Sequence, residues 1–239
     1  MWLALETATD RASVAVGAGG QDAVEESLTG SRRHAGALLP MIQAVLLRRG
    51  VTLDQVSGVV VSDGPGSFTG LRVGASIGKA LAHARGLPLW TAPSLIVRAA
   101  GVVRGGPSLV LAVSDALRGD LYAAAVRFDG GRVRVELGPG VWRLDALAAL
   151  DLAPDVLVGE APAAAVQVLE RRTGLEMIGP PEGAPHAARL IGLVTSEGGA
   201  RQVQDPQDWE PVYGRPAEAQ ARWEIAHGRP LPDSVGDTR

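Results

Sequence analysis

The sequence predicts a two-lobed α/β protein built by internal duplication, with mixed sheets flanked by helices. Short apolar segments alternate with longer amphipathic ones along the chain, as expected for strands alternating with helices. Residues 3–16 and 111–126 share the order strand, polar turn, strand, and each opens one half of the chain. We therefore expect a first lobe over residues 1–105, a second over 106–199 and a partly packed tail over 200–239, with the Gly-Gly-Pro cluster after residue 104 marking the boundary between the lobes.

The first half is expected to contain five strands and three helices. The strands are predicted at residues 2–7, 13–18, 22–28, 56–62 and 87–92, and the helices at 33–49, 69–85 and 94–103. The strand at 56–62 is a continuous β-branched run, which is typical of a strand covered on both faces. The helix at 33–49 carries apolar residues at three- and four-residue spacing, so one of its faces is expected to be buried.

The second half repeats the alternation in a weaker form. Strands are predicted at residues 109–114, 121–128, 132–137 and 156–158, and helices at 144–150, 163–172 and 186–197. The chain after residue 198 is rich in proline, glutamine and charge, which is typical of a segment that packs only in part.

Composition excludes several classes of protein. The chain has 239 residues, 46% of them hydrophobic, and a net charge of −3, so it lacks the basic surplus of a free-standing nucleic-acid binder. It has no cysteine, which excludes disulfides, thiolate metal sites and a cysteine nucleophile. The four histidines do not form pairs at metal-binding spacing, so no metal site is predicted. Without a signal peptide or an apolar run that could span a bilayer, the expected location is the cytoplasm.

A polar cluster follows the first predicted strand. Glu6, Thr7, Thr9 and Asp10 lie where ligands bind in open α/β sheets, and Asp115 occupies the matching place in the second half. In two-lobed phosphotransfer folds, such paired hairpins face each other across a nucleotide. Alternatively, these residues only build the turn, because Thr and Asp side chains bond neighbouring backbone groups.

A glycine-rich loop at residues 64–70 separates a strand from a helix. Its N–H groups could bind an anion, and Ser67 or Thr69 could cap the helix. The loop lacks the Gly-Lys-Ser/Thr of a Walker A motif. A tight strand-to-helix turn that needs glycine explains the same residues without a ligand.

Three glycines recur every four residues in the helix that follows, at Gly70, Gly74 and Gly78. Glycine in a helix interior costs about 1 kcal/mol relative to alanine, so three on one face need a reason. Two interpretations are open: close packing on the protein's own sheet, or close approach of a helix from another subunit.

Three motifs carry a family resemblance. Residues 61–74 read VSDGPGSFTGLRVG, residues 5–9 read LETAT and residues 33–42 read RHAGALLPMI. In this order and spacing they closely resemble the bacterial dimerisation subunit of the tRNA threonylcarbamoyladenosine synthesis complex. Residues 115–122 and 210–213 resemble its second-lobe hairpin and C-terminal signature, although Tyr213-Gly214-Arg215 departs from the usual Tyr-Leu-Arg.

The resemblance implies an actin-like ATPase (ribonuclease H-like) fold and a non-catalytic role. The family's subunit pairs through its first-lobe helices with a catalytic paralogue that transfers a threonylcarbamoyl group to adenosine 37 of tRNA. A small ATPase subunit then docks on the pair, tRNA binds through the complex, and a homodimer can form in isolation. No cofactor of its own is expected, with ATP acting at the level of the complex.

The sequence agrees with a subunit that is not itself an enzyme. Where the catalytic paralogue carries a histidine-rich metal motif, this chain has Thr91-Ala92-Pro93-Ser94-Leu95. We therefore assign no catalytic residue and expect at most a vestigial nucleotide site at Glu6, Thr7, Thr9, Asp10 and Asp115. The alternatives are an ATP-binding kinase or transferase of the same superfamily that acts alone, or a homodimeric binding module.

The predicted partner interface lies on the two long first-lobe helices. It comprises Arg33, Leu38, Ile42, Val45, Leu46, Leu71, Gly74, Ala75 and Gly78. On this interpretation, Gly74→Arg blocks pairing and leaves the lobe folded.

Overall fold

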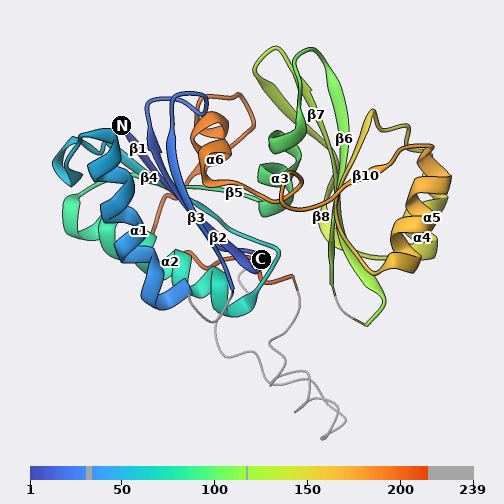
Figure 1. Cartoon of the computed structure of the whole chain (residues 1–239), viewed down its shortest axis with the longest axis horizontal. Coiled ribbons are helices and arrows are strands. Elements are labelled where there is room, and N and C mark those ends of the chain that lie inside the picture. Colours follow the sequence, from blue (N-terminus) through green and yellow to red (C-terminus); the bar gives the residue numbers. More distant parts are fainter. Residues whose placement is uncertain (31–33, 117, 215–239) are drawn as a thin grey trace, which may run out of the picture.

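Two β-sheets alternate with three layers of helices in the computed structural model of the protein (Figure 1). The structure describes residues 1–30, 34–116 and 118–214. Helices α1 and α2 cover the outer face of the first sheet, helices α4 and α5 cover the outer face of the second sheet, and α3 and α6 lie between the sheets. The predicted α/β architecture with two mixed sheets flanked by helices is confirmed.

The first sheet has six strands in the order β11-β5-β4-β1-β2-β3. Their bounds are β1 (Trp2–Glu6), β2 (Arg11–Gly17), β3 (Val24–Thr29), β4 (Gly58–Ser62), β5 (Leu89–Ala92) and β11 (Arg201–Gln202). Strand β1 pairs antiparallel with β2 and parallel with β4, and β4 pairs parallel with β5. All five residues of β4 are buried because helices cover both faces of the sheet, as its continuous apolar sequence predicts.

The second sheet has five strands in the order β10-β9-β6-β7-β8. Their bounds are β6 (Ser108–Asp115), β7 (Asp120–Asp129), β8 (Arg132–Arg143), β9 (Val156–Glu160) and β10 (Met177–Ile178). The order β5-β4-β1-β2-β3 of the first sheet therefore recurs in the second. This shared order confirms the duplication expected from the paired hairpins.

The helices follow the predicted order. They are α1 (His34–Arg49), α2 (Phe68–Arg85), α3 (Ser94–Val102), α4 (Leu144–Ala149), α5 (Ala163–Thr173) and α6 (Ala187–Val194), with a short 3₁₀ turn η2 (Leu53–Gln55). The hydroxyl of Ser67 caps α2 by accepting from the Gly70 N–H at 3.2 Å, and Gly86 ends the helix in a left-handed conformation at φ 61°. No helix among the described residues is long and apolar enough to cross a membrane.

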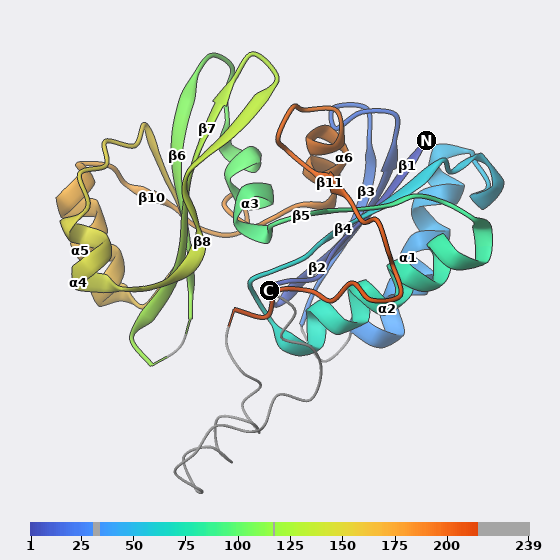
Figure 2. The same cartoon turned by 180° about the vertical axis from the view of Figure 1, so that it is seen from behind.

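The end of the described chain returns to the first sheet. Strand β11 pairs antiparallel with β5, and residues 203–214, which we call the C-terminal strap, run beside α2 (Figure 2). The Val212 N–H donates to the Asp63 carbonyl oxygen at 2.6 Å, and the Tyr122 hydroxyl of β7 donates to the Tyr213 carbonyl oxygen at 3.3 Å. The strap therefore contacts both halves of the duplication, while the lobe boundaries expected from sequence stay a prediction.

Helix α2 lies unusually close to the first sheet along its glycine face. A β-carbon built on Gly70 would collide with the Thr7 carbonyl oxygen, and one on Gly74 with the Thr7 hydroxyl. One on Gly78 would lie 2.7 Å from a methyl group of Val61. The glycines thus serve packing on the protein's own sheet. The expectation that Gly74→Arg leaves the lobe folded is wrong, because no space exists for the side chain.

Gly70→Ala and Gly74→Ala are expected to destabilise the protein. Alanine favours a helix over glycine by about 1 kcal/mol, but overpacking against Thr7 costs about 1–3 kcal/mol, and Gly70 faces a backbone atom that cannot rotate away. Urea unfolding should show a lower midpoint for both variants.

Gly36→Ala is the matched control, because a β-carbon at this exposed position of α1 would meet nothing within 4 Å. It should raise the midpoint through helix propensity alone. A Gly74→Ala protein as stable as Gly36→Ala would contradict the packing role of the glycine face.

Candidate interaction surface

The residues predicted to bind a partner face the protein's own core. On α1, Leu38, Ile42, Val45 and Leu46 are at most 9% exposed, and the helix packs against β2 and β3. On α2, Leu71, Gly74, Ala75 and Gly78 are also buried. Seven of these eight residues face the first sheet, so their assignment to a partner interface is wrong. Ala75 is 5% exposed and lines the groove beside α2 that is described below, and Arg33 lies outside the described residues.

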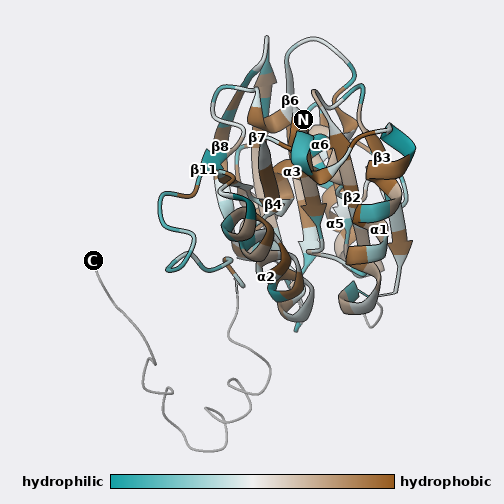
Figure 3. Ribbon diagram, turned by 90° about the vertical axis from the view of Figure 1, so that its left-hand side faces the viewer, coloured by the Kyte–Doolittle hydropathy of each residue, from teal (hydrophilic) through white to brown (hydrophobic). Residues whose placement is uncertain are grey.

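The opposite face of α1 is exposed and carries two large apolar side chains, with Gln43 between them. Leu39 is 54% exposed and Leu47 is 82% exposed, and they lie eight residues apart on the same side of the helix. Pro40 and Gly36 are exposed beside them. Helices α1 and α2 lie side by side, as Figure 3 shows from that side of the molecule. We call the surface formed by the exposed residues of α1 and by Ser76 and Ala80 of α2 the outer helix face.

The sequence carried a signal for this surface. Leu38 and Leu39 are adjacent, as are Leu46 and Leu47, so α1 is apolar on two sides. A surface helix of a globular protein usually has one apolar side. The second apolar side indicates a partner, and the sequence-based assignment chose the wrong side.

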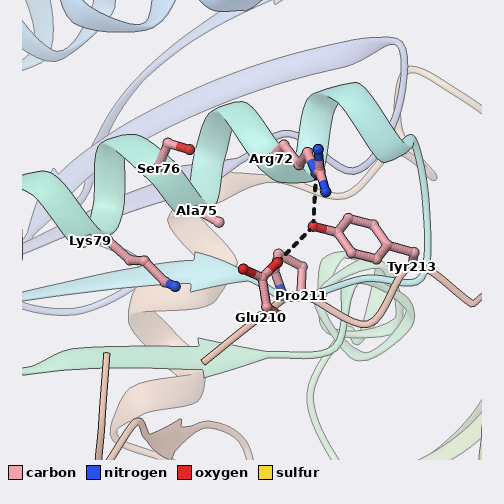
Figure 4. Close-up of a pocket in the computed structure, with 7 residues that line it drawn as sticks. All are labelled: Arg72, Ala75, Ser76, Lys79, Glu210, Pro211 and Tyr213. Carbon is pink, nitrogen blue, oxygen red and sulfur yellow. Dashed lines mark hydrogen bonds between the residues drawn. The ribbon is translucent and has the colours of Figure 1, made fainter. Parts of the chain in front are cut away.

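A groove runs between α2 and the C-terminal strap (Figure 4). Its volume is about 240 Å³, and its lining residues are Arg72, Ala75, Ser76, Lys79, Glu210, Pro211 and Tyr213. Positions 72, 76 and 79 share one side of α2, since they are separated by about one helical turn each. Lys79 is the only lysine of the chain.

Aromatic and polar contacts fix the two cations of the groove. The Arg72 guanidinium lies 4.4 Å from the Phe68 ring centre, and its Nε donates to the Tyr213 hydroxyl at 3.3 Å. The Tyr213 hydroxyl donates in turn to Glu210 at 3.0 Å, as Figure 4 shows. Lys79 Nζ donates to the Gln207 carbonyl oxygen at 3.2 Å. The hydrogen bond from Arg72 to Tyr213 and the nearby Glu210 carboxylate raise the pKa of Arg72 above its ordinary value.

Two of the residues predicted for a nucleotide site are sealed inside the first lobe. Glu6 is 0% exposed and Thr7 is 1% exposed. The Glu6 carboxylate accepts from the Ala8 N–H at 2.7 Å, and Thr7 lies under the glycines of α2. Their assignment to an accessible nucleotide site is wrong, because the packing of α2 closes the end of β1.

Of the other three predicted nucleotide-site residues, Thr9 and Asp10 lie in the turn after β1, and Asp115 is the last residue of β6. The Thr9 hydroxyl accepts from the Arg11 N–H at 3.2 Å, and the Asp10 carbonyl oxygen accepts from the Gly30 N–H at 2.9 Å. The Thr9 contact matches the turn-building alternative, in which a side chain bonds a neighbouring backbone group. Asp115 is exposed at the end of β6 in the second sheet. No group of three metal-binding side chains occurs within residues 1–30, 34–116 and 118–214.

Two N–H groups of the glycine-rich loop, those of Ser67 and Gly70, bond within the protein. The Ser67 N–H donates to the Ala8 carbonyl oxygen at 2.7 Å, and the Leu71 N–H donates to the Ser67 carbonyl oxygen at 2.8 Å. A β-carbon on Gly66 would collide with Ala8. These contacts favour the tight-turn interpretation of the loop over an anion site.

A buried arginine of the first half of the chain, Arg98, bonds two residues of the second half. Arg98 of α3 is 1% exposed, and it donates to the Gly183 carbonyl oxygen at 2.8 Å and to Glu160 at 3.1 Å. Burial raises the pKa of Glu6 from 4.5 to about 7, although the Ala8 N–H, the Ser62 hydroxyl and the Arg98 charge lower it. Near neutral pH, the Glu6 carboxyl is therefore divided between its protonated and ionised forms.

Glu6→Gln should change how stability depends on pH. Between pH 4.5 and about 7, folded Glu6 holds a proton that the unfolded chain releases, so the free energy of unfolding falls as pH rises. Complete ionisation costs up to about 3 kcal/mol, and glutamine avoids this cost while still accepting from the Ala8 N–H. In urea unfolding series, Glu6→Gln should gain stability relative to the unsubstituted protein between pH 5 and pH 8.

Glu176→Gln provides a control on an exposed carboxyl group. Its stability should run parallel to that of the unsubstituted protein over the same pH range. Parallel curves for Glu6→Gln as well would show that Glu6 is ionised without cost at pH 5.

Comparisons with known proteins agree with this architecture. Residues 28–176 match the family model TsaD, described as tRNA N6-adenosine threonylcarbamoyltransferase. The tRNA threonylcarbamoyladenosine biosynthesis protein TsaB of Escherichia coli (strain K12) is 37% identical over 128 residues, which cover 53% of this chain and 55% of that protein. The chain thus spans about half the length of the first curated relatives that it matches. TsaB of Bacillus subtilis (strain 168) is 29% identical over 80% of this chain and 84% of that protein.

A solved structure covers nearly the whole described chain. YeaZ from Pseudomonas aeruginosa superposes with a TM-score of 0.73 at 27% identity, over 89% of this chain and 98% of that one. The two mixed sheets, their helices and these matches together identify the two-lobed actin-like fold. The chain belongs to the family whose model is TsaD, described as tRNA N6-adenosine threonylcarbamoyltransferase, and its similarity to TsaB and YeaZ makes it a TsaB/YeaZ-like member of that family.

Proposed function

We propose that the protein is a non-catalytic subunit that binds and activates the catalytic threonylcarbamoyl transferase of the TsaD type. The observation that carries this proposal is the exposed apolar side of α1, where Leu39 and Leu47 lie more than half exposed. Large apolar side chains exposed together mark binding surfaces. In a relative of a tRNA-modifying transferase, the natural occupant is the catalytic subunit of the same system.

The closed strand ends support a non-catalytic role. Ligands in open α/β sheets bind beyond the carboxyl ends of the parallel strands. Here Glu6 and Thr7 are buried and the glycine-rich loop is bonded to Ala8. Ser94 follows β5, and its hydroxyl donates to the Pro65 carbonyl oxygen at 2.5 Å, so this region holds the loop in place. A kinase or transferase acting alone would need these groups for its substrate.

The remaining proposed partners are a second copy of the chain, a small ATPase subunit and tRNA. Two copies of the chain could cover the outer helix face reciprocally when the catalytic subunit is absent, giving a homodimer. A small ATPase subunit and tRNA then act on the heteromeric pair, and any ATP is bound at the level of the complex. The outer helix face therefore binds the catalytic subunit when that subunit is present, and a second copy of the chain when it is absent.

The test is light scattering behind a sizing column, on the chain alone and mixed with the catalytic paralogue of the same organism. A new species at the summed mass, with threonylcarbamoyl transfer to tRNA rising only in the mixture, is expected. Separate peaks and unchanged transfer would reject the proposal. ATP binding by the isolated chain in the micromolar range, lost in Asp10→Ala, would favour the solitary kinase or transferase.

Leu39→Glu and Leu47→Glu should each weaken the pairing at least about 30-fold. Burying a new carboxylate at the centre of an interface of about 1,600 Å² costs about 2 kcal/mol or more. Titration calorimetry with the catalytic paralogue would measure the loss of affinity. Threonylcarbamoyl transfer should fall in parallel when this chain is present at a concentration too low to saturate the paralogue.

Val135→Glu is the matched control, since it places the same charge on an exposed valine (41%) of β8 in the second sheet. It should bind like the unsubstituted chain. If all three variants bind alike, the outer helix face is not the pairing surface.

A further inference from the structure

We propose that the groove between α2 and the C-terminal strap binds an acidic segment of the partner protein, with carboxylates paired to Arg72 and Lys79. This inference rests on the proposed function, because it adds a charged rim to the outer helix face. Ser76 belongs to both the groove and that face, so the two surfaces are continuous along α2. A partner seated on α1 and α2 therefore reaches the groove without a separate binding event.

The spacing of the cations defines what can bind. Arg72 and Lys79 lie seven residues apart on one helix, which separates their backbones by about 10 Å along the axis. A partner helix lying alongside α2 would match them with two acidic residues seven positions apart. The Ser76 hydroxyl between the cations can hydrogen-bond a carboxylate of the same segment.

Contacts with Phe68 and Tyr213 orient the Arg72 side chain so that its guanidinium can bind a carboxylate. The Phe68 ring lies against one side of the guanidinium at 4.4 Å, and the Tyr213 hydroxyl accepts from Nε at 3.3 Å. Within the described part of the chain, no hydrogen bond uses the two terminal nitrogens of Arg72. These two nitrogens can donate in parallel to both oxygens of a carboxylate. A side chain already fixed in place loses less conformational entropy on binding.

The charges favour a protein segment over RNA. Glu210 lines the same groove, so a continuous phosphodiester backbone would pass a carboxylate between its contacts. A peptide carries separate charges and can place a hydrogen-bond donor opposite Glu210. RNA binding also needs an extended basic surface, whereas this chain has a net charge of −3.

The test measures association of the full chain with the catalytic paralogue by stopped flow at several salt concentrations. Charges at the rim of an interface act mainly on the association rate and its salt dependence. Arg72→Gln and Lys79→Gln should each lower the association rate about 3-fold at low salt, and together about 10-fold, with a flatter salt dependence. Dissociation rates should stay within about 2-fold.

Arg85→Gln is the matched control. It removes the same charge from α2 outside the groove, where Arg85 forms an exposed ion pair with Asp54. Tyr213→Phe adds a second probe, because it keeps the ring and removes the hydroxyl that orients Arg72. It should lower the association rate by less than Arg72→Gln does.

Each outcome decides the proposal. A double groove variant that associates like Arg85→Gln, while Leu39→Glu still weakens binding, overturns the groove and leaves the proposed function intact. Normal binding by Leu39→Glu overturns the outer helix face and this inference with it. If the groove variants instead lose binding of tRNA to the complex, measured by fluorescence anisotropy, with unchanged subunit association, the groove is an RNA site and the acidic-peptide assignment is wrong.

Discussion

The close seating of α2 on the first sheet is the constraint on which the binding surfaces depend. Gly70 and Gly74 present no side chain to Thr7, so the backbone of α2 approaches β1 closely. With this face turned inward, the helical period fixes the direction of every other residue of α2. Arg72 and Lys79 then line the groove, while Val73 and Ile77 turn toward the core beneath the two helices. A rotation of α2 that relieved the glycine face would remove the groove and the outer helix face together.

The C-terminal strap couples that helix to the second sheet. The Tyr213 ring packs at a tilt against the Phe68 ring of α2, with the ring centres 4.6 Å apart. The Tyr213 carbonyl oxygen accepts from the Tyr122 hydroxyl of β7. The carbonyl oxygen of the buried Asp63 accepts from the Val212 N–H of the strap. The Asp63 carboxylate forms an ion pair with Arg201 of β11 at 2.9 Å. Because Tyr213 and Glu210 form one wall of the groove, the groove's shape depends on how the two sheets are placed.

Periodicity predicted the order of the elements well, because most strands and helices here bury an apolar face. It could not tell which neighbour covers each face. Leu38 and Leu39 are equally apolar, and only the tertiary structure turns Leu38 to the sheet and Leu39 to solvent. Strand β11 was missed because Arg201 and Gln202 carry no apolar pattern, and their pairing with β5 joins residues more than a hundred positions apart. The groove was missed for the same reason, since its two walls are distant in sequence.

The strap and an accessible anion site at the glycine-rich loop exclude each other. The Val212 carbonyl oxygen lies so close to Gly64 that no side chain fits there. The Ser67 N–H already donates to the Ala8 carbonyl oxygen. A phosphate group could reach the loop only after the strap moves away and the Ser67 contact breaks. Moving the strap would also release Tyr213 from Arg72 and open the groove wall. In this chain, the segment that packs over the glycine-rich loop at Gly64 is therefore the same segment that forms one wall of the groove.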